Sequence, residues 1–177
     1  MFKFRELNKI NTKRLCMTAL FAAICCAGTF IAVPLPIGYF NVGDLFVLCS
    51  GWALSLPFGA AAAAIGSMLA DILLGYASYA PATLIIKGAV ALCAGIFHKI
   101  LCKRIRHAYP TYLISAVLGE CLMIGGYYLF EAYLLGFGSG AAASLPGNGM
   151  QALCAIVFAP ALMTALMRNR AARNALL

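Results

Sequence analysis

Long stretches without charged residues dominate this sequence and decide which kind of structure it can form. The runs 15–33 and 45–70 contain no charged side chain, and the runs 81–101, 112–137 and 145–167 contain very few. A helix of roughly 20 residues crosses a lipid bilayer. Only 10% of the chain is charged, whereas soluble domains carry about 25%. We therefore expect an integral membrane protein whose solvent is lipid.

The distribution of basic residues predicts how many helices there are. The run 45–70 is long enough for one tilted helix, or for two short ones broken at Leu56-Pro57-Phe58-Gly59. Flanks rich in Lys and Arg stay in the cytoplasm. They form three clusters here: Lys3, Arg5, Lys9, Lys13 and Arg14; Lys99, Lys103, Arg104 and Arg106; and Arg168, Arg170 and Arg173. Only two helices in the run 45–70 place all three clusters inside, so we predict an all-α membrane protein: a six-transmembrane-helix bundle with both termini cytoplasmic.

The whole chain, residues 1–177, is predicted to be a single integral membrane domain. Residues 1–13 would be a cytoplasmic N-terminal segment, 14–167 the six-helix bundle, and 168–177 a cytoplasmic tail. The first helix is expected to remain as an anchor, because no small-residue cleavage site follows it. The second helix has to borrow residues 38–43 to span, so we expect it to be tilted, broken or partly re-entrant.

Several classes of function lack support in the sequence. The net charge of +8 does not indicate nucleic-acid binding, because the basic residues flank membrane spans without interleaved aromatic residues. The eight cysteines show no CxxC spacing, which favours packing roles over a metal site. The motifs GxxxxGK[ST], HExxH and GxSxG are missing, so we expect neither ATP hydrolysis by this chain nor an enzyme, and no cofactor.

Charged residues within the spans mark the candidate site, because a charge inside a membrane is costly and usually functional. From the rise of 1.5 Å per residue, Asp71, Lys87 and Glu131 fall in the outer half of their helices. Polar residues of the outer loops and of the sixth helix lie at the same depth, so we expect one outward-opening pocket. Its predicted substrate-binding residues are Asn41, Asp44, Tyr79, Lys87, Tyr127, Glu131, Asn148 and Gln151.

Structural roles compete with ligand binding at these positions. Asp71 and Lys87 lie on adjacent helices and could form a buried ion pair. Glu120 lies deeper, where an interhelical hydrogen bond is the simpler expectation, and Asn148 follows Pro146-Gly147 as an N-cap residue would. The tyrosines could form an interfacial belt or stack on a planar ligand.

Small residues repeat every four positions on two helices. The first helix carries Ala19, Ala23 and Ala27, and the third carries Gly59, Ala63, Ser67, Asp71 and Gly75. Such stripes let helices approach closely in lipid. Each stripe therefore either packs inside the bundle or forms a docking surface for a partner subunit.

Several short segments, taken in order, resemble a known family. They are Phe40-Asn-Val-Gly-Asp44, Gly66-Ser-Met-Leu-Ala-Asp71, Tyr79-Ala-Pro-Ala-Thr83, Ile86-Lys-Gly88, Gly126-Tyr-Tyr-Leu-Phe-Glu131 and Leu145-Pro-Gly-Asn148. Together they make residues 14–167 similar to the substrate-binding S component of an energy-coupling factor (ECF) transporter.

The resemblance implies a function. An S component of this kind captures a vitamin or related micronutrient outside a bacterial plasma membrane; here an aromatic nitrogen heterocycle is expected, riboflavin-type by the family label. It docks through Ala19 and Ala23 onto a transmembrane coupling subunit that two cytoplasmic ATPase subunits drive. The alternatives are a self-sufficient proton-coupled transporter or channel, with Asp71, Glu120 and Glu131 as a relay, and a membrane enzyme. Dependence of uptake on a separate ATPase would distinguish an S component from a self-sufficient transporter or channel.

Overall fold

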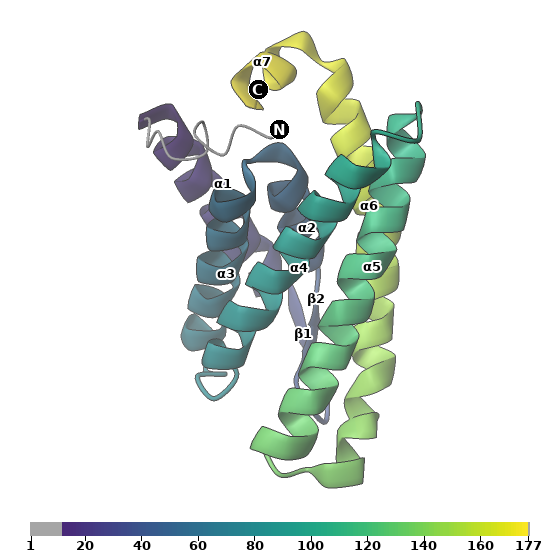
Figure 1. The fold of residues 1–177 in the computed structure, drawn as a ribbon. Helices are drawn as coiled ribbons and strands as arrows, with labels where there is room; N and C mark the ends of the chain where they lie inside the picture. The colour runs from purple at the N-terminus through teal and green to yellow at the C-terminus, as the bar shows by residue number, and fades with distance from the viewer. Residues whose placement is uncertain (1–11, 177) are drawn as a thin grey trace.

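The computed structural model describes residues 12–176, which are almost entirely helical (Figure 1). In chain order the elements are α1 (Thr12–Phe30), β1 (Ala32–Pro34), β2 (Tyr39–Asn41), α2 (Gly43–Ala53), α3 (Leu56–Leu73), α4 (Ala80–Leu101), α5 (Ala108–Leu129), the π-helical turn η2 (Phe130–Leu134), the 3-10 helix η3 (Gly138–Ser144), α6 (Leu145–Arg168) and α7 (Arg170–Leu176). Lys3, Arg5 and Lys9, and most of the predicted segment 1–13, lie outside the described residues.

Five segments of the described chain are long and apolar enough to cross a membrane. They are α1, α3, α4, α5 continued by η2, and η3 continued by α6. Large apolar side chains such as Leu20, Ile85 and Phe158 are exposed on their outer faces, as lipid contact requires and water would disfavour. The predicted all-α class is therefore confirmed.

The run 45–70 is divided between two helices. Helix α2 ends at Ala53 and α3 begins at Leu56, with Pro57 in its first turn. Proline suits that position because its missing N–H has no partner there in any helix. The interruption thus lies just before the Leu-Pro-Phe-Gly segment that sequence analysis identifies.

Helix α2 lies in the centre of the bundle. Nine of its 11 residues are buried, and it packs against α1, α3, α4 and α6. At 1.5 Å per residue its length is about 16 Å, roughly half the hydrocarbon thickness of a bilayer. Its first and last residues, Gly43 and Ala53, are themselves buried, and irregular backbone at membrane depth is tolerated where protein covers it.

A short β-hairpin precedes α2 and was not predicted. Strand β1 pairs antiparallel with β2, with Val33 opposite Phe40. Pro34 and Pro36 cannot continue a helix and favour extended backbone before them, so α1 ends at Phe30 and not at Val33 as expected. Residues 39–41, which sequence analysis assigned to a lengthened second helix, form β2 instead.

Close packing of α1 against α3 explains the small residues of α3. A Cβ atom added at Gly66 would meet the backbone carbonyl of Ala22, so the two backbones can approach only because this position is glycine. Four of the five predicted stripe residues are buried in α3, Gly59, Ala63, Ser67 and Asp71, whereas Gly75 lies beyond the end of the helix and is exposed. Internal packing, and not docking, is the role of this stripe.

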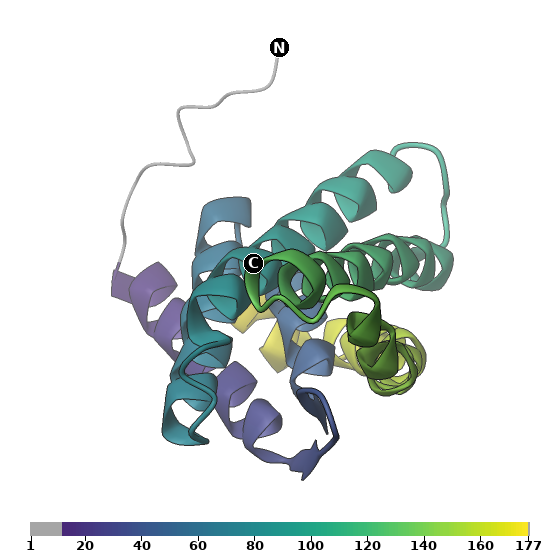
Figure 2. The same cartoon turned by 90° about the horizontal axis from the view of Figure 1, so that it is seen from below.

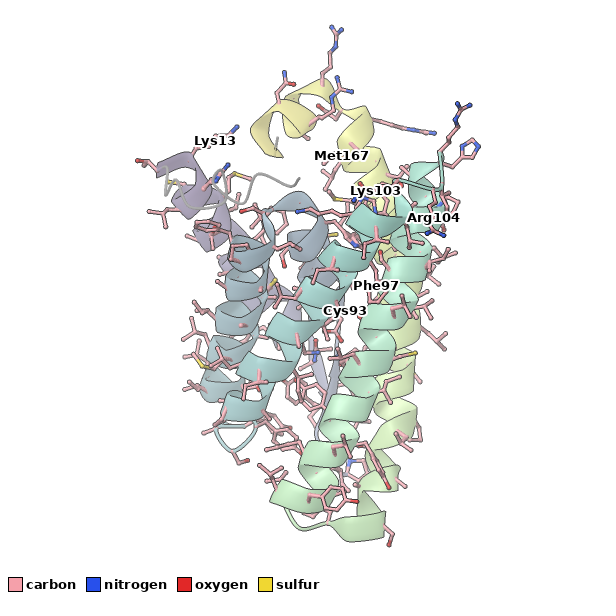
Figure 3. All side chains as sticks on the ribbon, viewed as in Figure 1. Lys13, Cys93, Phe97, Lys103, Arg104 and Met167 are labelled. Atoms are coloured by element: carbon pink, nitrogen blue, oxygen red, sulfur yellow. The ribbon has the colours of Figure 1, made fainter. Side chains whose placement is uncertain are left out.

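The basic residues lie at one end of the bundle, and η2 and η3 lie at the other end. Figure 3 shows Lys13, Lys103 and Arg104 at the end where α7 lies. The Nζ of Lys13 donates a hydrogen bond to the backbone oxygen of Asn174 at 3.1 Å, which joins the start of α1 to α7. Figure 2 looks at the other end, with the η2–η3 segment nearest the viewer.

Candidate ligand pocket

A pocket opens at the end of the bundle opposite the basic residues. The β-hairpin, the C-terminal turn of α3, the start of α4, the junction of α5 with η2 and the start of α6 all contribute to it. The unfilled space here is about 310 Å³ when the open solvent at the mouth is counted, and its enclosed part is small, about 20 Å³. Its lining residues are Gly38, Tyr39, Asn41, Asp71, Tyr79, Thr83, Tyr127, Glu131, Asn148 and Gln151.

Most residues of the predicted site come together here. Six of the eight line the pocket: Asn41, Tyr79, Tyr127, Glu131, Asn148 and Gln151. The other two, Asp44 and Lys87, are buried beneath it and do not line it. Gln151 joins the pocket wall to the buried residues beneath it, because its Nε2 donates a hydrogen bond to Asp44 Oδ2 at 2.5 Å.

The hairpin brings its residues to the pocket through a tight turn. Gly38 has φ of +68°, in the left-handed region that glycine adopts without steric cost. Beyond the turn, the backbone N–H of Asn41 donates to Gln151 Oε1 at 3.0 Å, and the Asn41 side-chain oxygen accepts from the N–H of Gly43 at 2.8 Å. These bonds fix the hairpin to α6 and to the start of α2.

Two carboxyl groups form part of the pocket wall. The hydroxyl of Tyr39 donates to Asp71 Oδ1. Glu131 accepts from the hydroxyl of Ser144 and, at 3.4 Å, from that of Tyr79. The second oxygen of Asp71, Oδ2, is buried and has no hydrogen-bond partner among the described residues.

Burial also keeps Tyr79, which donates to Glu131, in its protonated form. Desolvation and the nearby Glu131 raise the pKa of the Tyr79 phenol above its ordinary value. This phenol therefore keeps its proton at neutral pH and acts as a donor.

A π-helical turn places Glu131 in the wall. Residues 130–134 depart from the α-helical repeat, and such turns are frequent at functional sites. Tyr127, one turn earlier, also lines the pocket and shares a hydrogen bond of 2.9 Å with Thr83. Tyr127 and Glu131 therefore both line the pocket, although the backbone between them is not regularly α-helical.

Lys87 is paired with Asp44, and not with Asp71. The ammonium group contacts Asp44 Oδ1 directly, and the two side chains are 4% and 1% exposed. It also lies 5.1 Å from the centre of the Tyr127 ring, within the range of a cation–π interaction. Lys87 pairs with Asp44 because α2, in the centre of the bundle, brings Asp44 next to α4.

Two other expected structural roles are not observed. Both carboxyl oxygens of Glu120 are buried without a hydrogen-bond partner in the described chain, so the expected interhelical hydrogen bond is missing. Asn148 lies inside α6, which begins at Leu145 after Ser144, so it is not an N-cap residue. Its Nδ2 instead donates to Ser144 Oγ at 3.4 Å.

The sequence-based site omits four lining residues. They are Gly38, Tyr39, Asp71 and Thr83. Asp71 is predicted to lie in the outer half of its helix, at the depth of the pocket, but it is also the expected ion-pair partner of Lys87. Tyr39 is considered only with the other tyrosines, as part of a belt or a stacking surface. Thr83 carried a usable signal, since it lies four residues after Tyr79 and four before Lys87, on one face of α4.

The small-residue stripe of α1 faces away from the bundle. Ala19, Ala23 and Ala27 are exposed, whereas Phe21 and Cys25 on the opposite face are buried. Packing among residues 12–176 therefore does not account for the stripe.

Comparison with known proteins agrees with these features. The chain is 32% identical, over 137 residues, to a Pyrococcus woesei protein described as "Uncharacterized protein in gap 3'region", and the match covers 76% of this chain and 88% of the relative. Residues 9–168 match the family described as "ECF-type riboflavin transporter, S component". The chain therefore belongs to the ECF-type riboflavin transporter S component family, whose members are membrane proteins.

Proposed function

We propose that this chain is the substrate-binding subunit of an ECF-type importer in a bacterial plasma membrane. It captures a vitamin or related micronutrient, an aromatic nitrogen heterocycle, at the outer surface. Delivery to the cytoplasm requires a separate energising module, made of a transmembrane coupling subunit and two cytoplasmic ATPases. The chain itself performs no chemistry on its cargo.

The position of the pocket carries this proposal. It opens at the end of the bundle opposite Lys13, Lys103 and Arg104. Because basic flanks remain in the cytoplasm, the pocket faces outside and both termini face inside. In this arrangement the hairpin and α2 together cross the membrane after α1, and with the five long segments they complete six crossings. The pocket wall also combines tyrosines with polar groups, a composition suited to a planar, polar ligand.

The predicted binding residues have two roles in the proposal. Those in the wall contact the ligand: Asn41, Tyr79, Tyr127, Glu131, Asn148 and Gln151. Asp44 and Lys87 hold Gln151 in position from below, through the hydrogen bond of 2.5 Å between Asp44 and Gln151. These two act as positioning residues for capture.

Docking is assigned to the exposed stripe of α1. Ala19 and Ala23 present a flat helix surface without large side chains, which a helix of the coupling subunit can approach closely. A large side chain on this stripe is expected to block that approach without disturbing the pocket. Binding and delivery thus depend on different surfaces of the same chain.

Uptake measurements in cells test the proposal. Cells that express the chain together with an ECF energising module should accumulate the compound that the purified protein binds, and cells that lack the module should not. Ala19→Trp and Ala23→Trp should abolish uptake while leaving binding by the purified protein unchanged. Ile85→Trp is the matched control, because Ile85 is 72% exposed on α4, away from the stripe.

Two outcomes would reject parts of this assignment. Uptake without any energising module would favour a self-sufficient transporter over a capture subunit. Normal uptake by both tryptophan variants would show that α1 does not dock through this stripe.

A further inference from the structure

The described pocket wall contains carboxyl groups but no cationic side chain. Asp71 and Glu131 line it, and none of the lining residues in the described chain is Lys, Arg or His. Lys87 lies four residues after the lining residue Thr83. Its ammonium group is already paired with Asp44 below the pocket. The remaining basic residues of the described helices lie toward the opposite end (Figure 3). The pocket therefore has an excess of acidic groups.

The surrounding hydroxyl groups show that these carboxyls act as acceptors. Three hydroxyls, those of Tyr39, Tyr79 and Ser144, donate to them. A group that receives donors from its neighbours presents its remaining lone pairs to whatever enters the pocket.

One acceptor is left without a partner. Asp71 is only 1% exposed, and its Oδ2 has no hydrogen-bond partner among the described residues. A buried polar atom that is neither hydrated nor paired is costly. Since Asp71 is part of the pocket wall, a ligand that supplies a donor there removes this cost.

We infer that the pocket takes a nitrogen heterocycle with a positive charge, on the ring or on an attached ammonium or amidinium group, held between Asp71 and Glu131. This inference rests on the proposed capture function and specifies its substrate class. Charge-assisted N–H donors suit the carboxylate oxygens, and the faces of Tyr79 and Tyr127 suit a delocalised cation.

Other charge classes fit this wall less well. An anionic ligand would bring a third acidic group next to two carboxyls, in a wall that has no Lys, Arg or His among its described lining residues. A neutral flavin, which the family description suggests, offers hydrogen-bond donors but no positive charge. The net charge of the ligand therefore distinguishes the inference from the family label.

Fractionated yeast extract provides an experiment that does not require the ligand to be known. The extract is separated at pH 7 by ion exchange into cationic, neutral and anionic small-molecule fractions. Each fraction, and riboflavin as a defined neutral probe, is added to the full-length protein in detergent, and the melting temperature is measured. We expect the cationic fraction alone to raise it, in proportion to the amount added.

Two variants and one control locate the effect. Asp71→Asn and Glu131→Gln keep the shape of each side chain and remove its charge, so at least tenfold more of the cationic fraction should be needed for half the shift. Glu120→Gln removes a buried carboxyl that does not line the pocket, and its response should equal that of the wild type.

The outcomes separate this inference from the function on which it rests. Stabilisation of the wild-type protein by the neutral fraction, the anionic fraction or riboflavin would overturn the cationic class and retain the capture function. If neither riboflavin nor any fraction stabilises the wild-type protein, the capture function itself is rejected.

Discussion

Replacement of Lys87 by methionine should destabilise the protein strongly. Lys87 and Asp44 are 4% and 1% exposed and in direct contact, so the variant leaves the Asp44 carboxylate buried without its cation. Removing one partner of a buried ion pair costs about 3–5 kcal/mol. The retained hydrogen bond from Gln151 to Asp44, at 2.5 Å, offsets part of this cost, which places the expected loss near the lower limit.

The reverse change and the double variant complete the cycle. Asp44→Asn leaves Lys87 without its counter-charge and should cost a similar amount. The double variant Lys87→Met/Asp44→Asn contains neither charge and should cost much less than the sum, about 0–2 kcal/mol, because a buried pair is often no better than neutral groups of similar size. The two substitutions should therefore be coupled by several kcal/mol, with the second change compensating for the first.

Reversible unfolding in mixed detergent micelles measures these free energies. Lys99→Met is the matched control on the same helix, because Lys99 is exposed, and a surface substitution should stay within about 0.5 kcal/mol. A loss below about 1 kcal/mol for Lys87→Met, or additive losses in the double variant, would refute the argument that the pair is buried and mutually dependent.

Three further predictions test other parts of the structure. Glu120→Met should raise the free energy of unfolding by about 1–3 kcal/mol, because it removes a buried carboxyl without a hydrogen-bond partner; a loss of stability would mean that Glu120 has a partner. Gly66→Leu should separate α1 from α3, since even a Cβ there meets the Ala22 carbonyl, and should lower the melting temperature, whereas an unchanged value would contradict the packing described. A membrane-impermeant maleimide should label Ser139→Cys in intact cells above the wild-type background and Arg106→Cys only after permeabilisation, because both positions are exposed, at opposite ends of the bundle; the reverse pattern would invert the proposed orientation.

Much of the helical framework and of the pocket could be predicted from local features of the sequence. Charge-free runs determine which segments become helices, because the cost of burying charge in lipid is large. The depth of a residue follows from the helical rise, so Asp71, Glu131 and Gln151 could be assigned to the outer half of three separate helices. The same reasoning failed for the hairpin, since strands of three residues are too short to show a period of two.

The pairing of Lys87 could not be predicted in this way. Sequence analysis considered Asp71 as its partner because α3 and α4 are consecutive, whereas the structure brings in Asp44 from α2. That choice depends on α2 occupying the centre of the bundle, an arrangement of many helices that no local pattern encodes. For the same reason, the sequence could not predict that Ala23 is exposed and Ala63 is buried. The spacing of small residues does not show which neighbouring helix covers them.

Mass spectrometry of the small molecules released from detergent-purified protein tests the central claim most directly. A capture subunit should carry its cargo through purification, so we predict one compound in stoichiometric amount from the wild type and little or none from Glu131→Gln purified in parallel. A wild-type protein that releases nothing, or a compound retained equally by Glu131→Gln, would contradict the account of this pocket as a substrate-capture site.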